Sequence, residues 1–300
     1  MAYDFLLSSG TLSNGRTVHY AQRAGTAEPK FVIGYRTNYL GNFGLFNTQV
    51  NADLVYKPAD FTTQFGFWAH FIYPTSMAES QGSYLCLNTY DRAKCTFSFM
   101  QYGAHVPNGD FVKFLRKLLA LPKGLEYFPK LSIQNGRINY RNSNGTFTPL
   151  ESDASTQGLM DYFNPNLTEV DNQELICAAR LVHWATKEAD HRKVQVETAI
   201  EHFRSNMISY DNRFNLHNVP AKVCQVICDI RHQGRGMNDR IAAALNTGGD
   251  YEKAYKNLLT IGDTNYASRI NTVKTEINKM VATGIFNKKY NRADNSFVNA

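Results

Sequence analysis

The last third of the chain is patterned as a series of amphipathic helices, and this feature most constrains the fold. Asn218 is expected to cap the first helix, and Gly234 and Gly236 are expected to end it. Its apolar residues recur with helical spacing at Val223, Val226, Ile227 and Ile230. Similar spacing predicts three further helices around residues 241–245, 251–258 and 267–277. Together with strand-like segments elsewhere, this predicts a mostly helical α+β protein.

The first 60 residues differ, because they carry turn signals such as Asn14-Gly15 and the alternation that is typical of short strands. Residues 80–105 are expected to form a hairpin or a small three-stranded sheet, and residues 131–149 a hairpin insertion. Helical spacing predicts a buried helix that approaches Glu79, which Pro74 would break or kink. Further helices are expected over residues 111–121 and 168–210.

The formal net charge of +6 favours polyanionic partners, and nucleic acid, anionic lipid and the bacterial wall all fit that description. Lys and Arg are scattered, so charge alone does not choose among them. No apolar run reaches the roughly 20 residues that a membrane span requires, so no membrane insertion is expected. Met1–Phe5 lacks a basic region followed by an apolar stretch, and synthesis in the cytoplasm without a classical signal peptide is therefore expected.

Cys86 and Cys95 flank the predicted hairpin and could pair in an oxidising compartment, although free thiols are the favoured interpretation, and no CxxC or zinc-ribbon spacing is present. His183 and His191 lie eight residues apart and are interpreted as part of a solvated helix face. No third ligand accompanies them, so neither a metal nor another cofactor is expected.

Three residues have the types that glycoside cleavage needs. Breaking a glycosidic bond requires a proton donor at the leaving oxygen and an anion that activates water or balances the developing positive charge. Glu79 follows an aromatic, largely uncharged segment, which favours a raised pKa and the role of acid. Asp91 lies in a predicted polar turn, and Thr96 at a strand position where its hydroxyl can hold water. Each also fits an ordinary structural role, as a helix-end, turn or strand residue.

The order of these three residues resembles the phage T4-type lysozymes. Glu79-Ser80 with Phe99-Met100-Gln101 is similar to the Glu-Ser…Leu-Met-Gln pattern of goose-type lysozymes and lytic transglycosylases. In the last third, residues 218–236 resemble the long helix of the phage-type helical lobe, and residues 265–269 match its Asn-x-Ala-x-Arg segment near the active site. The hairpin departs from the family pattern, because Ser98–Gln101 replaces Gly-x-Gly-His and His105 comes later. Residues 1–60 have no counterpart, and residues 106–215 are much longer than the family's interlobe helix.

The resemblance implies a two-lobed lysozyme-like fold, with a small β-hairpin lobe, a helical C-terminal lobe and a cleft between them. It implies residues 1–60 as an accessory segment and residues 61–290 as the catalytic domain, with an extended insertion at about 106–215. The expected activity is hydrolysis of the β-1,4 bond between N-acetylmuramic acid and N-acetylglucosamine. Glu79 is the expected acid, Asp91 the base or stabilising anion, and Thr96 the residue that holds water. The expected sugar-binding residues are Tyr90, Gln101, Tyr102 and His105.

Peptidoglycan is the expected partner, in the periplasm of a target or host cell, and nucleic acid is not expected. Delivery would require other machinery, either a phage lysis system or a secretion system that injects an antibacterial effector, which would also imply an immunity protein. A lytic transglycosylase and a chitosanase are the enzymatic alternatives. A non-catalytic wall-binding or phage structural module is the alternative from another class.

Overall fold

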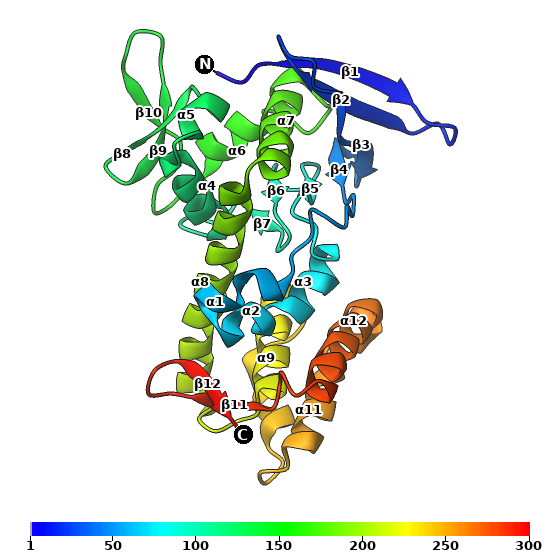
Figure 1. The fold of residues 1–300 in the computed structure, drawn as a ribbon, viewed down its shortest axis with the longest axis vertical. Coiled ribbons are helices and arrows are strands. Elements are labelled where there is room, and N and C mark those ends of the chain that lie inside the picture. Colours follow the sequence, from blue (N-terminus) through cyan, green and yellow to red (C-terminus); the bar gives the residue numbers. More distant parts are fainter. Residues whose placement is uncertain (1) are drawn as a thin grey trace. The chain divides into compact units, whose positions relative to one another are not determined.

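The computed structural model describes residues 2–300, and Met1, where the segment inspected for a signal peptide begins, lies outside them. The chain divides into two compact units. Unit 1 contains the residues up to Val55 together with Ser83–Thr198, and unit 2 contains Tyr56–Gly82 and Ala199–Ala300. Helices and strands are mixed along the chain, which confirms the predicted α+β class (Figure 1).

Unit 1 is built on a seven-stranded antiparallel sheet whose strands are ordered as they follow one another in the chain. Its strands are β1 (Phe5–Thr11), β2 (Thr17–Arg23), β3 (Phe31–Tyr39), β4 (Asn42–Asn47), β5 (Leu87–Asn88), β6 (Thr96–Phe97) and β7 (Tyr102–Gly103). The predicted small sheet at residues 80–105 is therefore only the last part of a larger one. Strand β4 pairs directly with β5, which joins the first 47 residues to the hairpin region.

The insertion predicted at residues 131–149 is a separate three-stranded sheet in the order β10-β9-β8. Its strands are β8 (Leu131–Gln134), β9 (Arg137–Arg141) and β10 (Phe147–Pro149). Unit 1 also contains α4 (Asp110–Ala120), α5 (Gly124–Tyr127), α6 (Gln157–Phe163) and α7 (Asn172–Lys187). The side chain of Asp171 accepts a hydrogen bond from the Glu174 N–H and so caps α7. The single helix expected over residues 168–210 is two, because Glu188 is extended between α7 and α8 (Ala189–Phe214).

Aromatic side chains fill the core of unit 1. Tyr127 stacks between Tyr3 and Trp184, with ring centroids 4.2 and 4.6 Å apart. Since Tyr3 precedes β1 and Trp184 lies on α7, this stack ties the start of the chain to the helices. Burial of such large rings is the main favourable contribution to this packing.

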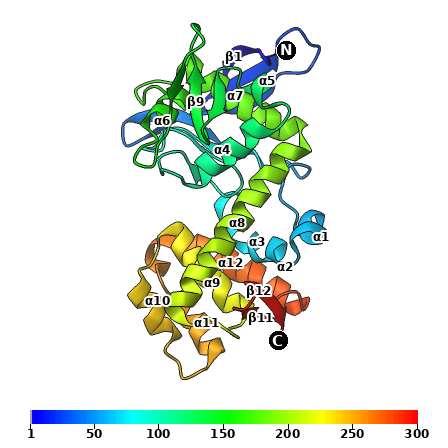
Figure 2. The same ribbon diagram turned by 90° about the vertical axis from the view of Figure 1, so that its left-hand side faces the viewer.

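Unit 2 is mostly helical. It contains the 3-10 helix η1 (Pro58–Phe61), α1 (Thr62–Phe65), α2 (Phe67–Phe71), α3 (Tyr73–Ser80), the second part of α8, α9 (Ala221–Gln233), α10 (Asn238–Leu245), α11 (Tyr251–Leu259), α12 (Asp263–Ala282), and the hairpin of β11 (Lys288–Asn291) and β12 (Ser296–Asn299). Helix α3 packs against α12, and α11 packs against both α9 and α10 (Figure 2). Phe297 of β12 packs on α2, with its ring centroid 4.7 Å from that of Phe71. None of the helices in residues 2–300 combines the length and the apolar character that a bilayer crossing requires.

Two local predictions in unit 2 change in detail. Pro74 does interrupt the helix that approaches Glu79, since it occupies the first turn of α3 just after α2 ends. Asn218 does not cap α9: it has a positive φ of 64° and its N–H donates to the carbonyl of Tyr290, while the helix starts at Ala221.

The boundaries of the two compact units differ from those of the predicted domains. Residues 1–60 were predicted to be accessory to a catalytic domain at 61–290. Residues up to Val55 share one sheet with β5–β7 in unit 1, and the segment Tyr56–Gly82 belongs with the C-terminal helices of unit 2. The predicted insertion at 106–215 likewise divides, because α8 continues from unit 1 into unit 2.

Candidate active site

Glu79 lies in the last turn of α3, where its side chain is 11% exposed. The helix ends at once, because Gln81 adopts a left-handed conformation that directs its N–H back to the carbonyl of Met77. Two basic side chains contact one carboxylate oxygen of Glu79. Nη1 of Arg269 on α12 lies 2.5 Å from Oε1, and Nε2 of His232 on α9 lies 3.3 Å from it.

Asp229 holds Arg269 in this position. This carboxylate is fully buried and accepts a hydrogen bond from Nη2 of Arg269 at 2.7 Å. It also forms an ion pair with Arg235 at 3.3 Å and accepts the Thr75 hydroxyl at 3.2 Å. Because each oxygen of Asp229 is satisfied, the Arg269 guanidinium is fixed from behind and directed at Glu79.

These two side chains set the direction in which the pKa of Glu79 is shifted. Burial raises its pKa, but the hydrogen bonds and positive charges of His232 and Arg269 outweigh burial and hold the pKa below its ordinary value. We predicted a raised pKa from the uncharged segment that precedes Glu79. That prediction is wrong, because the residues that lower the pKa come from α9 and α12 and not from the preceding segment.

Asp91 lies in the turn between β5 and β6, as predicted, in unit 1. Its carboxylate accepts hydrogen bonds from the Ala93 N–H at 2.8 Å and from the Asn88 amide at 3.1 Å. Thr96 is on β6 directly opposite Asn88. Asn88 therefore links the two predicted residues: it bonds one and faces the other across the sheet.

Tyr90 and His105 lie near Asp91. Burial, followed by the negative charge of Asp91, raises the pKa of Tyr90. Burial and the positive charge of Arg92 lower the pKa of His105, while Asp91 opposes them. The structure thus gathers Asp91, Tyr90, His105 and Thr96 in the β5–β7 region of unit 1, whereas Glu79 belongs to unit 2.

The remaining two predicted sugar-binding residues differ. Tyr102 is 4% exposed, its hydroxyl donates to the Gln195 carbonyl at 2.8 Å, and its ring packs on Phe114. It is a core residue, which corrects the sugar-binding prediction. Gln101 is half-buried, with a positive φ of 53° in the turn before β7, and its role stays a prediction.

Sequence reasoning missed Asp229, its partner Thr75, and Gln225, whose amide donates to the Thr75 hydroxyl at 2.9 Å. A signal was present, because Gln225, Asp229 and His232 follow one another at helical spacing along α9, whose other buried residues are apolar. A polar stripe on a buried helix indicates a partner on another element.

The histidines and cysteines considered at first have structural surroundings. His183 and His191 lie on different helices and are buried, so the solvated helix face that we predicted is wrong. His183 contacts the Tyr127 hydroxyl at 2.8 Å and Glu28 at 3.2 Å. All five cysteines are free and buried within residues 2–300, and Cys86 and Cys95 form no disulfide there.

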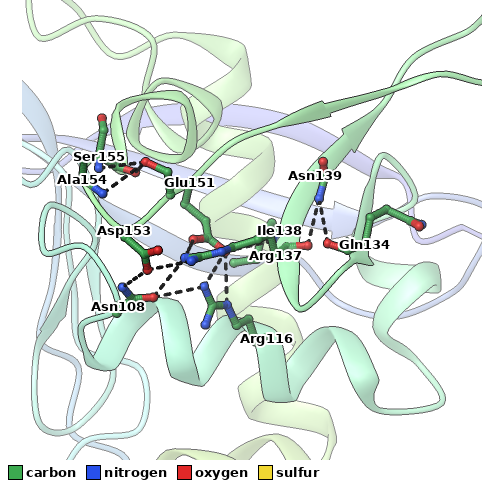
Figure 3. A network of polar contacts seen from close by, with 11 residues as sticks. Asn108, Arg116, Gln134, Arg137, Ile138, Asn139, Glu151, Asp153, Ala154 and Ser155 are labelled. Atoms are coloured by element: carbon green, nitrogen blue, oxygen red, sulfur yellow. Dashed lines mark hydrogen bonds and ion pairs between the residues drawn. The ribbon is translucent and has the colours of Figure 1, made fainter.

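A second buried carboxylate, Glu151 in unit 1, has only structural neighbours. Arg116 and Arg137 both donate to it, at 2.7 and 3.1 Å, as does the Ile138 N–H at 2.9 Å (Figure 3). Asn108 and Asp153 complete this network by binding the same guanidinium groups. It fastens the β8–β10 sheet to α4, so an arginine–carboxylate cluster alone does not identify a catalytic site.

Unit 2 also has a hollow of about 590 Å³ between α11 and α12, lined by Tyr255, Leu259 and Ile270 among others. Glu79 is not part of its lining. Comparison with models of known families, with curated proteins and with solved structures found no match to this chain.

Proposed function

We propose that this protein is a peptidoglycan hydrolase of the muramidase type, with Glu79 as the acid. The observation that carries the proposal is the environment of Glu79: a carboxylate at a helix end, nearly buried, held by Arg269 and backed by Asp229. Arg269 ends the segment 265–269, which is the one that resembles the Asn-x-Ala-x-Arg segment of phage-type lysozymes. The predicted acid and the predicted neighbouring segment are thus in contact through a direct ion pair.

In this mechanism the acid must carry a proton, which the cations around Glu79 disfavour. A bound glycan would favour the protonated acid, because it covers the exposed part of the carboxylate, removes the remaining water and so raises the pKa of Glu79. His232 lies 3.3 Å from Oε1, within reach for a proton to pass between the two side chains. Arg269 and Asp229 are positioning residues that keep Oε1 in place.

Asp91 and Thr96 take the other two roles. Asp91 activates water or balances the positive charge that develops on the sugar, and Thr96 holds the water. Asn88 orients the Asp91 carboxylate through its hydrogen bond. If these roles are right, variants of Glu79 and variants of Asp91 should impair the same cleavage reaction.

The positive net charge fits an anionic wall polymer as substrate. The expected place of action is the periplasm, after delivery by a phage lysis system or by injection from a rival cell. Injection would call for an immunity protein in the producing cell.

The test is digestion of purified peptidoglycan by the wild-type chain, Glu79→Gln and Asp91→Asn, with products resolved by mass spectrometry. The proposal is supported if the wild type releases muropeptides with reducing ends and both variants release at least about 100-fold less of them. Glu201→Gln, an exposed helical position in unit 2, is the matched control and should cleave normally. Anhydro products would move the assignment to lytic transglycosylases, and cleavage of chitosan alone would move it to chitosanases.

A non-catalytic wall-binding module is the second candidate, and the lowered pKa of Glu79 favours it. A carboxylate that stays ionised between two cations suits a structural ion pair better than proton donation. In that case the wild-type chain sediments with peptidoglycan and releases no fragments, and Glu79→Gln changes neither result.

A further inference from the structure

A row of side chains crosses the sheet of unit 1 from the predicted water-holding residue toward the N-terminal strands. Thr96 on β6 is opposite Asn88 on β5, and Asn88 is opposite Phe46 on β4. Phe46 in turn is opposite Tyr35 on β3. Because residues directly opposite one another project from the same face of a sheet, these four side chains share one face.

Tyr39 and Tyr90 extend the row into an aromatic cluster. Tyr39 is four residues after Tyr35 on β3, and so lies on the same face. The Tyr90 ring centroid is 5.8 Å from that of Tyr39 and 6.1 Å from that of Phe46. We call Tyr35, Tyr39, Phe46 and Tyr90 the aromatic row.

A glycine makes this arrangement possible. A Cβ atom at Gly44 would lie 2.7 Å from the backbone nitrogen of Tyr90 and from the Thr89 carbonyl carbon. Those contacts are with backbone, which cannot move aside cheaply. Only glycine on β4 therefore lets the chain at Thr89–Tyr90 lie this close and place Tyr90 between Tyr39 and Phe46.

Polar groups accompany the rings. The Arg16 guanidinium is 4.9 Å from the centre of the Tyr35 ring and donates to the Thr37 hydroxyl at 2.8 Å. The Gln49 amide donates to the Tyr35 hydroxyl at 3.4 Å. The rings are only partly covered: Tyr39 is 54% exposed, and Tyr35, Phe46 and Tyr90 are half-buried.

We infer that the aromatic row binds the glycan strand on which the proposed active site acts, as additional sugar subsites built by residues 35–46. This inference rests on the proposed function. The weakly positive C–H faces of a pyranose ring pack on aromatic faces, which carry negative potential. The amide of Gln49 and the guanidinium of Arg16 supply donors for hydroxyl, acetamido and carboxylate oxygens of such a strand.

Two observations identify a long glycan as the occupant. The row is continuous in register with Asn88 and Thr96, so a strand that lies along Asn88 can continue along the row. Its cation, Arg16, complements the carboxylates of the wall polymer. Single sugar–ring contacts are weak, and a series of them along one strand adds affinity that a short fragment does not obtain.

The test separates binding from cleavage by using Glu79→Gln as the background for binding measurements. Binding to purified peptidoglycan is measured by sedimentation, and binding to a hexamer of N-acetylglucosamine by calorimetry. Adding Tyr39→Ala should weaken binding roughly threefold to tenfold. Adding Arg16→Gln should weaken binding to peptidoglycan more than binding to the uncharged hexamer.

Phe147→Ala is the matched control. Phe147 is an exposed aromatic residue at 42%, with Arg141 6.0 Å from its ring centre, but it lies on β10 outside the row. It should bind like the background. Because Tyr39 is largely exposed, Tyr39→Ala is expected to fold normally, which circular dichroism checks.

The outcomes distinguish this inference from the proposed function. If the wild-type chain cleaves peptidoglycan through Glu79 and Tyr39→Ala binds unchanged, the aromatic row is overturned and the muramidase assignment stands. If the wild type cleaves nothing and Tyr39→Ala loses binding, the row is supported and the muramidase assignment fails. Equal weakening by Tyr39→Ala and Phe147→Ala overturns the row, because the effect is then not specific to it.

Discussion

Glu79 in unit 2 and Glu174 in unit 1 are both buried carboxylates on helices, yet their surroundings are opposite. Glu79 contacts Arg269 and His232, and its pKa is lowered. Glu174, on α7, is 1% exposed, and its Oε1 contacts the Thr89 hydroxyl and the Leu45 N–H, both neutral. Its Oε2 has no hydrogen-bond partner among residues 2–300, and burial raises its pKa to about 7.

The difference teaches that burial alone does not decide the protonation of a carboxylate. Burial raises the pKa in both cases, and only the presence of cations reverses the outcome at Glu79. By pKa alone, Glu174 would look like the better proton donor. Its carboxylate bonds to Leu45 and Thr89 within the sheet region of unit 1, where an unmet polar atom is a cost of packing, and Glu79 therefore stays our proposed acid.

The largest expected effect is a difference in cleavage activity between variants of Glu79 and of Glu174. Glu79→Gln should reduce peptidoglycan cleavage by about 10²- to 10⁴-fold, the usual contribution of a general acid. Glu174→Gln should keep most of the cleavage, because its carboxylate bonds to the Thr89 hydroxyl and the Leu45 N–H, to which we assign no catalytic role. Release of muropeptides by the two variants is compared at one pH. A larger loss in Glu174→Gln than in Glu79→Gln would reverse our assignment.

The second effect concerns Arg269, a cation that contacts Glu79. Arg269→Met leaves Glu79 and Asp229 without their shared guanidinium, and breaking such a buried pair costs about 3–5 kcal/mol in the free energy of unfolding. The pKa of Glu79 should rise, because one of the two positive charges that lower it is gone. Chemical denaturation measures the stability, and the pH dependence of cleavage measures the pKa. Lys274→Met, an exposed position on the same helix, serves as the control and should change neither.

The third effect is a gain in stability from Glu174→Gln that depends on pH. Glu174 has a folded-state pKa of about 7 against an ordinary value of 4.5, so the folded chain keeps a proton that the unfolded chain loses. Wild-type stability therefore falls as the pH rises from about 4.5 to 7, by about 3 kcal/mol if this group acts alone. Glutamine cannot ionise, so the variant should be more stable than the wild type at pH 8 and similar to it below pH 4.5. Denaturation midpoints of both proteins are measured from below pH 4.5 to pH 8. An equal gain in stability of the variant at the lowest and the highest pH would contradict this prediction.

The contribution of Glu79 to stability changes with pH in the opposite direction. The pKa of Glu79 is lowered in the folded state. Glu79 therefore stabilises the fold when the pH is above its ordinary pKa, and this stabilisation is lost as the pH falls through the folded-state pKa. Comparing Glu79→Gln with the wild type should therefore show a loss of stability at neutral pH that vanishes in acid. The two variants thus test one comparison with opposite slopes.

The smallest effect concerns Tyr102. Tyr102→Phe removes the hydrogen bond to the Gln195 carbonyl and should cost about 1 kcal/mol in the free energy of unfolding. Glycan binding and cleavage should not change, because the ring stays in the core. A clear loss of glycan affinity at unchanged stability would restore Tyr102 to the sugar-binding residues.

Sequence periodicity alone predicted most of the helices, because spacing, caps and stop signals act within a few residues. The interruption of the helix at Pro74, the helices of the last third and the short strands of residues 1–60 were identified in this way. The predicted turn at Asp91 and the strand at Thr96 were also found, since turn chemistry is local.

Only the tertiary structure decided which of these elements meet, and through that the electrostatics. The pairing of β4 with β5 joins the first strands to the hairpin that carries Asp91. Arg269 reaches Glu79 across 190 residues of sequence, and His232 comes from a third helix. Local sequence carries no information about such distant charges. The sequence therefore determined where Glu79 lies along its helix, while the fold determined its partners and the direction of its pKa shift.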